Sequence, residues 1–373
     1  MSETMLPGSG FDTYEEQDKV LVGMSGGVDS SVTVRILQQQ GFAVTGAVIR
    51  FSPAHDGAVE AAQKAAKQMD IECIVLDAQE LFEQQVVAPF CADYCAGRTP
   101  NPCVRCNPAV KFTALLAAAD RLGIQYIATG HYARVEVDGD GVSRIHLPQS
   151  AARDQSYMLS RLDQDVLSRL ILPLGEFEKD DVRQMARDFG LDCADAPDSM
   201  EICFIPDGDY PAYIEARGLA GKAGRFISPD GADLGPHKGV LHYTVGQRKG
   251  LGIALGEPVF IRQICENGDI LLGRSGEEFF TTVRVADIVT PDGAPLPAGS
   301  YLVKVRSAAQ AQPAAFDGVD TLVFEAPVRA APSSPALNKL TTKKRPGHTS
   351  PGRSVFYTCG GLTMFRQSRS PRS

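Results

Sequence analysis

The segment with the clearest potential for chemistry is SGGVDS, residues 25–30, which joins an apolar run to an amphipathic helical pattern. Gly26 and Gly27 let the main chain bend and approach a ligand without an intervening side chain. The first free N–H groups of a helix that begins near Ser30 would point at any anion bound there. A strand, a turn rich in serine and glycine, and a helix in this order predict a phosphate-binding loop and therefore nucleotide chemistry.

This turn is not a Walker A loop, because a GxxxxGK[ST] loop grips the β- and γ-phosphates with a lysine that residues 25–30 do not contain. Its SGGVDS pattern resembles the pyrophosphate-binding loop of the ATP pyrophosphatase superfamily. The resemblance implies that ATP is cleaved to AMP and pyrophosphate, that the substrate is adenylated, and that Asp29 either holds Mg²⁺ or orients the phosphates. The residues expected at ATP are Gly23, Met24, Ser25, Gly26, Gly27, Val28, Asp29, Ser30, Ile49 and Gly130.

Length and composition indicate a chain with a full core and no need of disulfide staples: 373 residues, 43% of them hydrophobic. No apolar run reaches the roughly 18 residues of a membrane span, and the leader, residues 1–18, is polar and acidic, unlike a signal peptide. We therefore expect a cytoplasmic protein whose nine cysteines are thiols, ligands or catalysts. The net charge is −8, yet residues 331–373 contain Lys and Arg without Asp or Glu, so any RNA contact should be local and basic.

The first 200 residues alternate strand and helix patterns, which predicts a doubly wound parallel α/β sheet. Strands are predicted at 19–24, 43–50, 71–77 and 125–129, with helices at 58–69 and 111–122, the latter ended by Gly123. The loop at 25–30 and TGHYAR, residues 129–134, would then share the carboxyl edge of the sheet, where such folds bind ligands. Short segments follow, so three domains are predicted: catalytic, residues 1–206; small and central, 207–277; and a C-terminal β-barrel with a basic, partly disordered tail, 278–373.

Six motifs together match one family. They are GMSGGVDSSV, AGRTPNPCVRCN, ATGHYAR, RDQSYMLSRL, DSMEICFI and YTVGQRKGLGI. In this order and spacing they resemble the bacterial tRNA-specific 2-thiouridylases over about residues 18–325. The resemblance implies an enzyme that replaces the 2-oxo oxygen of the wobble uridine of tRNA with sulfur. It also implies ATP and Mg²⁺ for activation, tRNAs of the Lys, Glu and Gln type, and a partner protein that delivers sulfur as a persulfide.

Two cysteines carry the sulfur chemistry in this interpretation. The resemblance makes Cys106, in NPCVRCN, the nucleophile or resolving thiol, and Cys203, in EICFI, the residue that carries the persulfide. A persulfide sulfur must be released by a second thiol within reach, so these two residues have to meet in space and can form a disulfide bond. The alternative for each is a buried, inert cysteine.

Cys103 leaves the mechanism open, because some family members have Asp at this position as a proton shuttle. In this chain Cys103, Cys106 and Cys203 provide three thiolates, enough to hold three irons of a [4Fe–4S] cluster as in related thiolases of the superfamily. Cys91 and Cys95 add a third interpretation, a tetrahedral zinc site with the CxxC pair. The simplest alternative is that Cys91 and Cys95, spaced i and i+4, pack against the core.

The tRNA-binding residues are implied by the resemblance alone. A stacked base must be turned out before it is modified, so a closed pocket is expected beside Cys106 and His131. Each residue implied at tRNA has a simpler alternative, which is a solvated surface position. For His131 the alternative is a histidine at the end of a strand whose hydrogen bonds are satisfied within the protein. The residues implied at tRNA are Asn101, Pro102, Cys103, His131, Arg153, Asp154, Gln155, Arg306 and Arg353.

The C-terminus departs from the family pattern, which closes its barrel with a segment like TPGQ before a VFY strand. This chain has SPGRSVFY, with Arg353 in place of Gln, so Arg353 and the cluster at 343–345 either contact phosphates or belong to an insertion without a role.

Three rival functions remain: another ATP pyrophosphatase such as an amidotransferase-type or lysidine synthetase, a non-enzymatic RNA-binding protein, and a zinc-stabilised scaffold. The cysteine pair argues against the first and the intact loop against the second.

Overall fold

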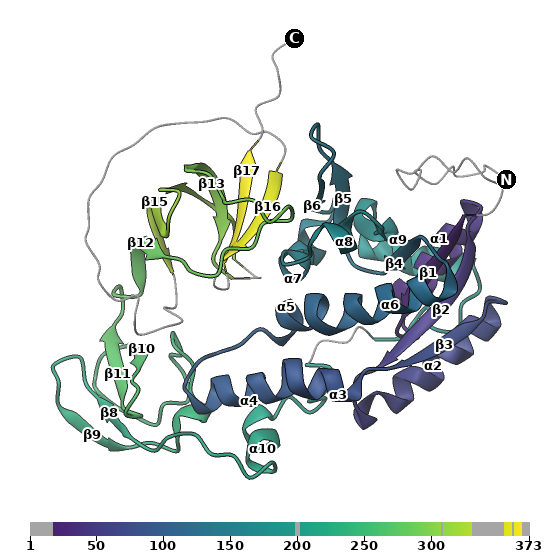
Figure 1. Ribbon diagram of the computed structural model, residues 1–373. Coiled ribbons are helices and arrows are strands. Elements are labelled where there is room, and N and C mark those ends of the chain that lie inside the picture. The colour runs from purple at the N-terminus through teal and green to yellow at the C-terminus, as the bar shows by residue number, and fades with distance from the viewer. Residues whose placement is uncertain (1–17, 198–201, 307–308, 330–353, 360–361, 368–373) are drawn as a thin grey trace.

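The computed structural model describes residues 18–197, 202–306, 309–329, 354–359 and 362–367, the last two as backbone only. Its N-terminal half is built on a five-stranded parallel sheet of order β3-β2-β1-β4-β7 (Figure 1). The strands are β1 (Lys19–Met24), β2 (Ala43–Arg50), β3 (Cys73–Asp77), β4 (Tyr126–Thr129) and β7 (Leu170–Ile171). The predicted parallel sheet is therefore present.

Two predicted strands begin later than expected. β3 begins at Cys73 rather than at residue 71, because Ile71 still donates its N–H to the Ala66 carbonyl in the turn after α2 (Asp56–Gln68). β4 begins at Tyr126 rather than at residue 125. The predicted helix 111–122 begins as α6 (Phe112–Leu122) and ends at Gly123 with φ of 64°, the left-handed cap that the glycine predicted.

Helices cover both faces of the parallel sheet, as the alternation along β1 requires. Val20 and Val22 pack into a core with α1 (Val28–Gln39), α2 and α9 (Lys179–Asp188). Leu21 points to the other face and packs into a core with α4 (Ala88–Cys95) and α6. Successive side chains of a strand point to opposite faces of the sheet, so an apolar run such as β1 must be covered by protein on both faces.

Two π-helical turns interrupt the helical region on the second face. The first, η2 (Glu83–Val87), joins α3 (Gln79–Phe82) to α4, and the second, η3 (Asn107–Lys111), joins α5 (Pro102–Cys106) to α6. Pro89 and Pro108 lie at these junctions and have no N–H to donate to the carbonyl four residues earlier. A single wider π-helical turn accommodates the missing backbone hydrogen bond, and such turns are frequent at functional sites.

Short elements complete the catalytic part of the chain. They are η1 (Pro53–His55), β5 (Arg134–Val137), β6 (Ser143–His146), η4 (Ala151–Arg153), α7 (Ser156–Leu159), α8 (Gln164–Leu167) and η5 (Pro173–Glu176). β5 and β6 form an antiparallel hairpin. None of the helices in the described ranges is both long and apolar enough to cross a membrane.

Two smaller sheets follow and lie on the opposite side of Figure 1 from the parallel sheet. The central sheet has the order β10-β11-β8-β9, and the C-terminal sheet, mainly antiparallel, has the order β12-β15-β14-β13-β17-β16. The elements of the central part are α10 (Tyr210–Glu215), β8 (Arg225–Ile227), β9 (Asp233–Pro236), η6 (Val240–His242), β10 (Val259–Ile264) and β11 (Ile270–Arg274). Those of the C-terminal part are β12 (Phe279–Arg284), β13 (Gly299–Lys304), β14 (Gln312–Phe316), β15 (Thr321–Arg329), β16 (Ser354–Cys359) and β17 (Leu362–Gln367).

The predicted domain limits, between residues 206 and 207 and between 277 and 278, stay predictions. The predicted tail disorder, the cluster at 343–345 and Arg353 lie outside the described residues.

Candidate nucleotide and thiol site

The SGGVDS loop lies where the strand order reverses. β1 has β2 on one side and β4 on the other, so the carboxyl ends of β1 and β4 open a crevice of the kind that binds ligands in such sheets. Gly26 adopts φ of 76°, and a Cβ there would lie 2.5 Å from the Cβ of Ala61. A Cβ on Gly130, directly after β4, would lie 2.8 Å from the carbonyl carbon of Asp29. Both glycines are needed for segments of the chain to close around the loop.

Serine side chains fasten the loop to the first turn of α1. The Ser25 N–H donates to Ser30 Oγ at 3.2 Å, and Ser31 Oγ donates to the Gly27 carbonyl at 3.0 Å. Ser30 and Ser31 are buried, whereas Ser25 is exposed at the crevice. The loop is therefore held in shape by its own hydrogen bonds, with the N-terminus of α1 available to an anion.

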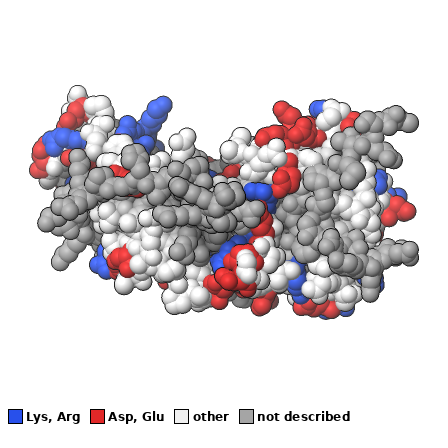
Figure 2. Space-filling view, turned by 90° about the horizontal axis from the view of Figure 1, so that it is seen from above, with Lys and Arg blue, Asp and Glu red and all other residues white. Residues whose placement is uncertain are grey.

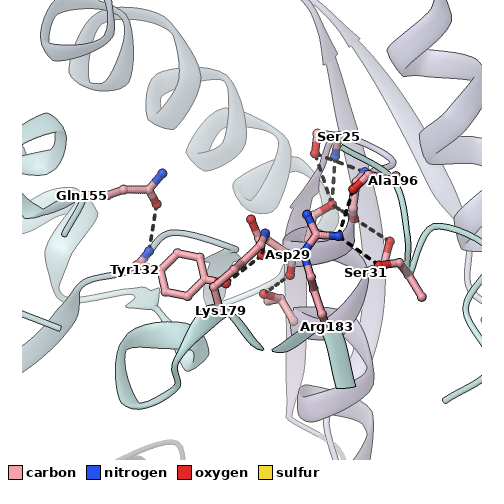
Figure 3. Close-up of polar contacts among 12 residues, drawn as sticks. Ser25, Asp29, Ser31, Tyr132, Gln155, Lys179, Arg183 and Ala196 are labelled. Carbon is pink, nitrogen blue, oxygen red and sulfur yellow. Dashed lines mark hydrogen bonds and ion pairs between the residues drawn. The ribbon is translucent and has the colours of Figure 1, made fainter. Parts of the chain in front are cut away.

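Asp29 is held by two residues from elsewhere in the chain (Figure 3). Tyr132 donates its hydroxyl to Asp29 Oδ1 at 2.8 Å, and Lys179 Nζ lies 2.7 Å from the same oxygen. The Lys179 side chain is 8% exposed and the Asp29 side chain 34% exposed, so the carboxylate is the group that faces the crevice. Sequence reasoning missed Lys179 and Tyr132, although a lysine in the first turn of a helix opposes the helix dipole and could have been noticed.

The other residues expected at ATP contribute mainly backbone. Met24, Val28 and Ile49 bury their side chains in the cores on the two faces of the sheet. Gly23 lies against Leu115 and Thr129, where a Cβ would approach both to 3.2 Å. A nucleotide in the crevice would thus meet the main chain of these residues, together with Ser25 and Asp29.

The two predicted reactive thiols both have raised pKa values, and the charge of Cys203 contributes to the shift at Cys106. Cys106 ends α5 and is buried, which raises the pKa of its thiol to about 12; charge on Cys203 and on Cys103 acts in the same direction. Cys203 is exposed at the surface, but enough protein surrounds its thiol for desolvation to raise that pKa to about 11. The pairing of Cys106 with Cys203 stays a prediction, and the eight cysteines whose side chains the structure describes are free thiols.

Lys111, at the end of η3, links the thiols to His131. Its ammonium lowers the pKa of Cys106 and of Cys203, against the larger effect of burial. Lys111 Nζ also lies 3.5 Å from His131 Nε2, while His131 Nδ1 lies 2.7 Å from Thr129 Oγ1. An ammonium can only donate, so Nε2 must accept and Nδ1 must carry the proton. Burial, and then the charge of Lys111, lower the pKa of His131 well below its usual value and keep the ring neutral.

The cysteine alternatives can now be compared with the geometry. Among the described residues, no group of three or more His, Cys, Asp or Glu is arranged to hold a metal ion, so the cluster and zinc interpretations find no support there. Cys91 and Cys95 lie on α4, and both pack against the core that includes α6. Packing, the simplest alternative for this pair, therefore describes it.

Apart from His131, the described residues expected at tRNA fall into three groups: residues 101–103 around the start of α5, Arg153, and a set with contacts inside the protein. Asn101 caps α5 by accepting from the Val104 N–H at 3.3 Å, with Pro102 in the first turn. Cys103 is exposed beside them. Arg153, the last residue of η4, is exposed. Asn101, Cys103 and Arg153 are thus exposed, and their contact with tRNA stays a prediction.

The third group joins parts of the protein. Gln155 Oε1 accepts from the Tyr132 N–H at 2.9 Å, and Asp154 forms a buried ion pair of 2.5 Å with Lys304 of β13. Arg306 lies two residues after Lys304, 3.5 Å from where a Cβ on Gly246 would be. Its positive charge lowers the pKa of Tyr157, against the larger effect of burial. Thus Gln155 is bonded within the N-terminal part, Asp154 links that part to β13, and Arg306 lies near Gly246 of the central part.

Comparison with known proteins identifies the family. A family model described as the tRNA methyl transferase HUP domain matches residues 18–207, and one described as the tRNA methyl transferase PRC-barrel domain matches residues 214–274. A tRNA-specific 2-thiouridylase MnmA of Carboxydothermus hydrogenoformans is 44% identical over 287 residues, which cover 72% of this chain and 78% of that relative. MnmA of Acetivibrio thermocellus is 40% identical over 369 residues, 93% of this chain and 97% of its own. The chain belongs to the tRNA-specific 2-thiouridylase family.

The family resemblance predicted from the six motifs and the predicted fold class are therefore confirmed. Among solved structures, an NMN synthetase of Francisella tularensis is 14% identical and covers 48% of this chain and 66% of its own, with a TM-score of 0.31. That similarity is too low to carry an argument. The family models name a methyl transferase and the curated relatives a thiouridylase, and the paired thiols of this site suit the second name.

Proposed function

We propose that this protein is a tRNA-uridine 2-sulfurtransferase that thiolates the wobble uridine with ATP. The observation that carries the proposal is that one chain of this family holds both a hydrogen-bonded pyrophosphate-type loop and two cysteines, of which Cys203 contributes to the raised pKa of Cys106. A nucleotide loop alone would also serve an amidotransferase-type or lysidine synthetase. Those reactions have no use for Cys106 and Cys203.

The chemistry has an activation step and a transfer step. The uridine 2-oxo group attacks the α-phosphorus of ATP, a new P–O bond forms, and pyrophosphate leaves from the loop at the N-terminus of α1. Mg²⁺, when bound, neutralises phosphate charge, and Asp29 fits it because a carboxylate oxygen is a ligand that Mg²⁺ prefers. The thiol site then needs only to replace AMP, which is a good leaving group.

Sulfur transfer uses the two thiols in turn. The terminal sulfur of a persulfide on Cys203 forms a bond to C2 of the uridine, and the bond from C2 to the AMP oxygen breaks. The Cys106 thiolate then attacks Cys203 Sγ, so the S–S bond breaks and its electron pair leaves on the sulfur of the base. The products are 2-thiouridine and a Cys106–Cys203 disulfide, which a thiol reductant must reduce before the next cycle.

The nature of the partners rests on the family. We expect the substrates to be tRNAs of the Lys, Glu and Gln type, with the target base turned out beside Cys106 and His131. Asn101, Pro102, Arg153 and Arg306 are proposed to contact RNA. On the face shown in Figure 2, the visible Lys and Arg lie in small groups beside Asp and Glu, which suits a few local phosphate contacts. A persulfide-carrying protein would load Cys203, which is exposed.

Mass spectrometry of tRNA nucleosides tests this function. A strain that lacks its own wobble-uridine thiolase should regain 2-thiouridine when it expresses this chain, and purified enzyme should form AMP only with tRNA present. The same analysis separates thiolated from methylated uridine by mass. Formation of ADP in place of AMP, or of a methylated base in place of a thiolated one, would contradict the proposal.

A further inference from the structure

Asp29 is held at one oxygen only, by two donors that come from distant parts of the chain. The Tyr132 hydroxyl and Lys179 Nζ both lie within 2.8 Å of Oδ1. Oδ2 has no hydrogen-bond partner among the described residues. Tyr132 is fixed in turn, because its N–H and carbonyl both bond to Gln155 and its ring lies 5.9 Å from Lys179 Nζ. Two donors on one oxygen set the rotation of the carboxylate and leave the other oxygen to a ligand.

The position of Lys179 is unfavourable by itself. Its side chain is 8% exposed, and burial of an ammonium carries a desolvation cost that one ion pair repays only when its geometry is good. It also lies in the first turn of α9, where the helix dipole disfavours a cation. Replacing a buried ion pair by apolar residues is often neutral or stabilising, so the pair is weak evidence for a purely structural role.

The exposed fractions of the Lys179 and Asp29 side chains indicate which of the two is more accessible to a ligand. The carboxylate of Asp29 is about four times as exposed as the Lys179 side chain, at 34% against 8%, and it sits at the start of α1 beside the loop. The lysine is therefore the less accessible member of the pair, and Asp29 is the member that a ligand can reach more readily. A lysine in this place holds Asp29, whereas the lysine of a Walker A loop touches phosphate itself.

We propose that Lys179 and Tyr132 are positioning residues that orient Asp29 by its Oδ1, so that Oδ2 is presented to magnesium pyrophosphate in the crevice. The inference rests on the proposed function, since it assigns these residues to the nucleotide step of that reaction. A single carboxylate suffices, because Mg²⁺ in nucleotide sites takes most of its ligands from phosphate and water. Lys179 lies 150 residues downstream of Asp29 in the sequence and acts on the phosphates only through this carboxylate.

Binding of Mg²⁺ with inorganic pyrophosphate to the full chain, measured by calorimetry without tRNA, tests the inference apart from turnover. Tyr132→Phe removes one hydroxyl and leaves no buried charge, and it should weaken binding about tenfold, the loss typical of one hydrogen bond to a charged group. Lys179→Met should weaken it further, and Lys179→Arg should restore part of the loss. Lys64→Met is the matched control, because Lys64 pairs with Asp192 on the surface and should bind as the unchanged protein does.

A double variant separates positioning from direct contact. If Lys179 acts through Asp29, Lys179→Met should add nothing to the loss in Asp29→Asn. Additive losses would mean that the lysine contacts phosphate independently, and tighter binding in Lys179→Met would mean that the ion pair competes with the metal; either result overturns the inference. Unchanged binding in Tyr132→Phe and Lys179→Met overturns it as well. Failure of the unchanged protein to bind magnesium pyrophosphate would instead overturn the proposed nucleotide step.

Discussion

The nucleotide loop and the thiol pair differ in how they are prepared for reaction. The loop comes from one continuous segment whose serines hydrogen-bond to its own backbone, and its carboxylate already has a cation and a hydroxyl on one oxygen. The thiols come from two segments about 100 residues apart, and desolvation by the surrounding protein raises the pKa of both, which favours the protonated form. The nucleotide site is thus preorganised, and the thiol site has to be activated when tRNA and persulfide are in place.

The largest expected effect separates the two regions outright. Asp29→Ala and Ser25→Ala should each reduce tRNA-dependent AMP formation about a thousandfold, because the first removes the carboxylate that would hold Mg²⁺ and the second removes a hydroxyl that can donate to the phosphates. Cys106→Ser and Cys203→Ser should eliminate thiolation, since a hydroxyl cannot carry or release sulfur, while AMP formation and tRNA binding persist. The measurements are AMP release by chromatography and 2-thiouridine by mass spectrometry. Thiolated tRNA produced by the Cys203→Ser protein would disprove the persulfide assignment.

The pH dependence of thiol reactivity measures how much of the Cys203 thiol is already deprotonated in the free enzyme. With the pKa of Cys203 near 11, the thiolate fraction should rise about tenfold for each pH unit from about 7 to about 10, because every pH in that range lies below the pKa. Alkylation of Cys203 by iodoacetamide, followed by mass spectrometry of the free enzyme, should show this slope. A plateau below about pH 9 would mean that the free enzyme already activates its thiol.

The same contrast explains what could be predicted from the sequence. The loop is a local pattern, so β1, the turn and α1 were predicted, as was the Gly123 cap. The meeting of Cys106 and Cys203 follows from chemistry, because one persulfide needs a second thiol, and it stays a prediction. The contacts of Tyr132, Lys179, Lys111 and Lys304 depend on where distant segments are placed, and no periodicity records that. The π-helical turns were also missed, although Pro89 and Pro108 mark them.

A third prediction concerns the junction that ties the barrel to the catalytic part. Lys304→Met leaves Asp154 buried without its cation, and we expect a loss of about 3 kcal/mol in the free energy of unfolding. The double variant Lys304→Met/Asp154→Asn should recover most of that loss, because no unpaired charge remains. Denaturant unfolding followed by circular dichroism measures both. Equal stability of the two variants would show that the ion pair is not what holds this junction.

The smallest effect is expected at Cys103, which tests whether the thiol region needs anything beyond its two main cysteines. The proposed reaction passes sulfur by thiols alone and gives Cys103 no step of its own. Cys103→Asp should then keep thiolation activity within about threefold, because Asp is the residue that some relatives use and it can manage protons near neutral pH.

Cys193→Ser and Cys265→Ser serve as controls, because both residues lie outside the group of interacting thiols, and both should be fully active. The decisive comparison is made on enzyme prepared without oxygen. A brown preparation whose iron and activity disappear together in Cys103→Ala would restore the cluster interpretation. A colourless, iron-free and active preparation leaves Lys111 and bound tRNA as the means by which Cys106 becomes a nucleophile, since Lys111 is the cation that lowers the pKa of both thiols.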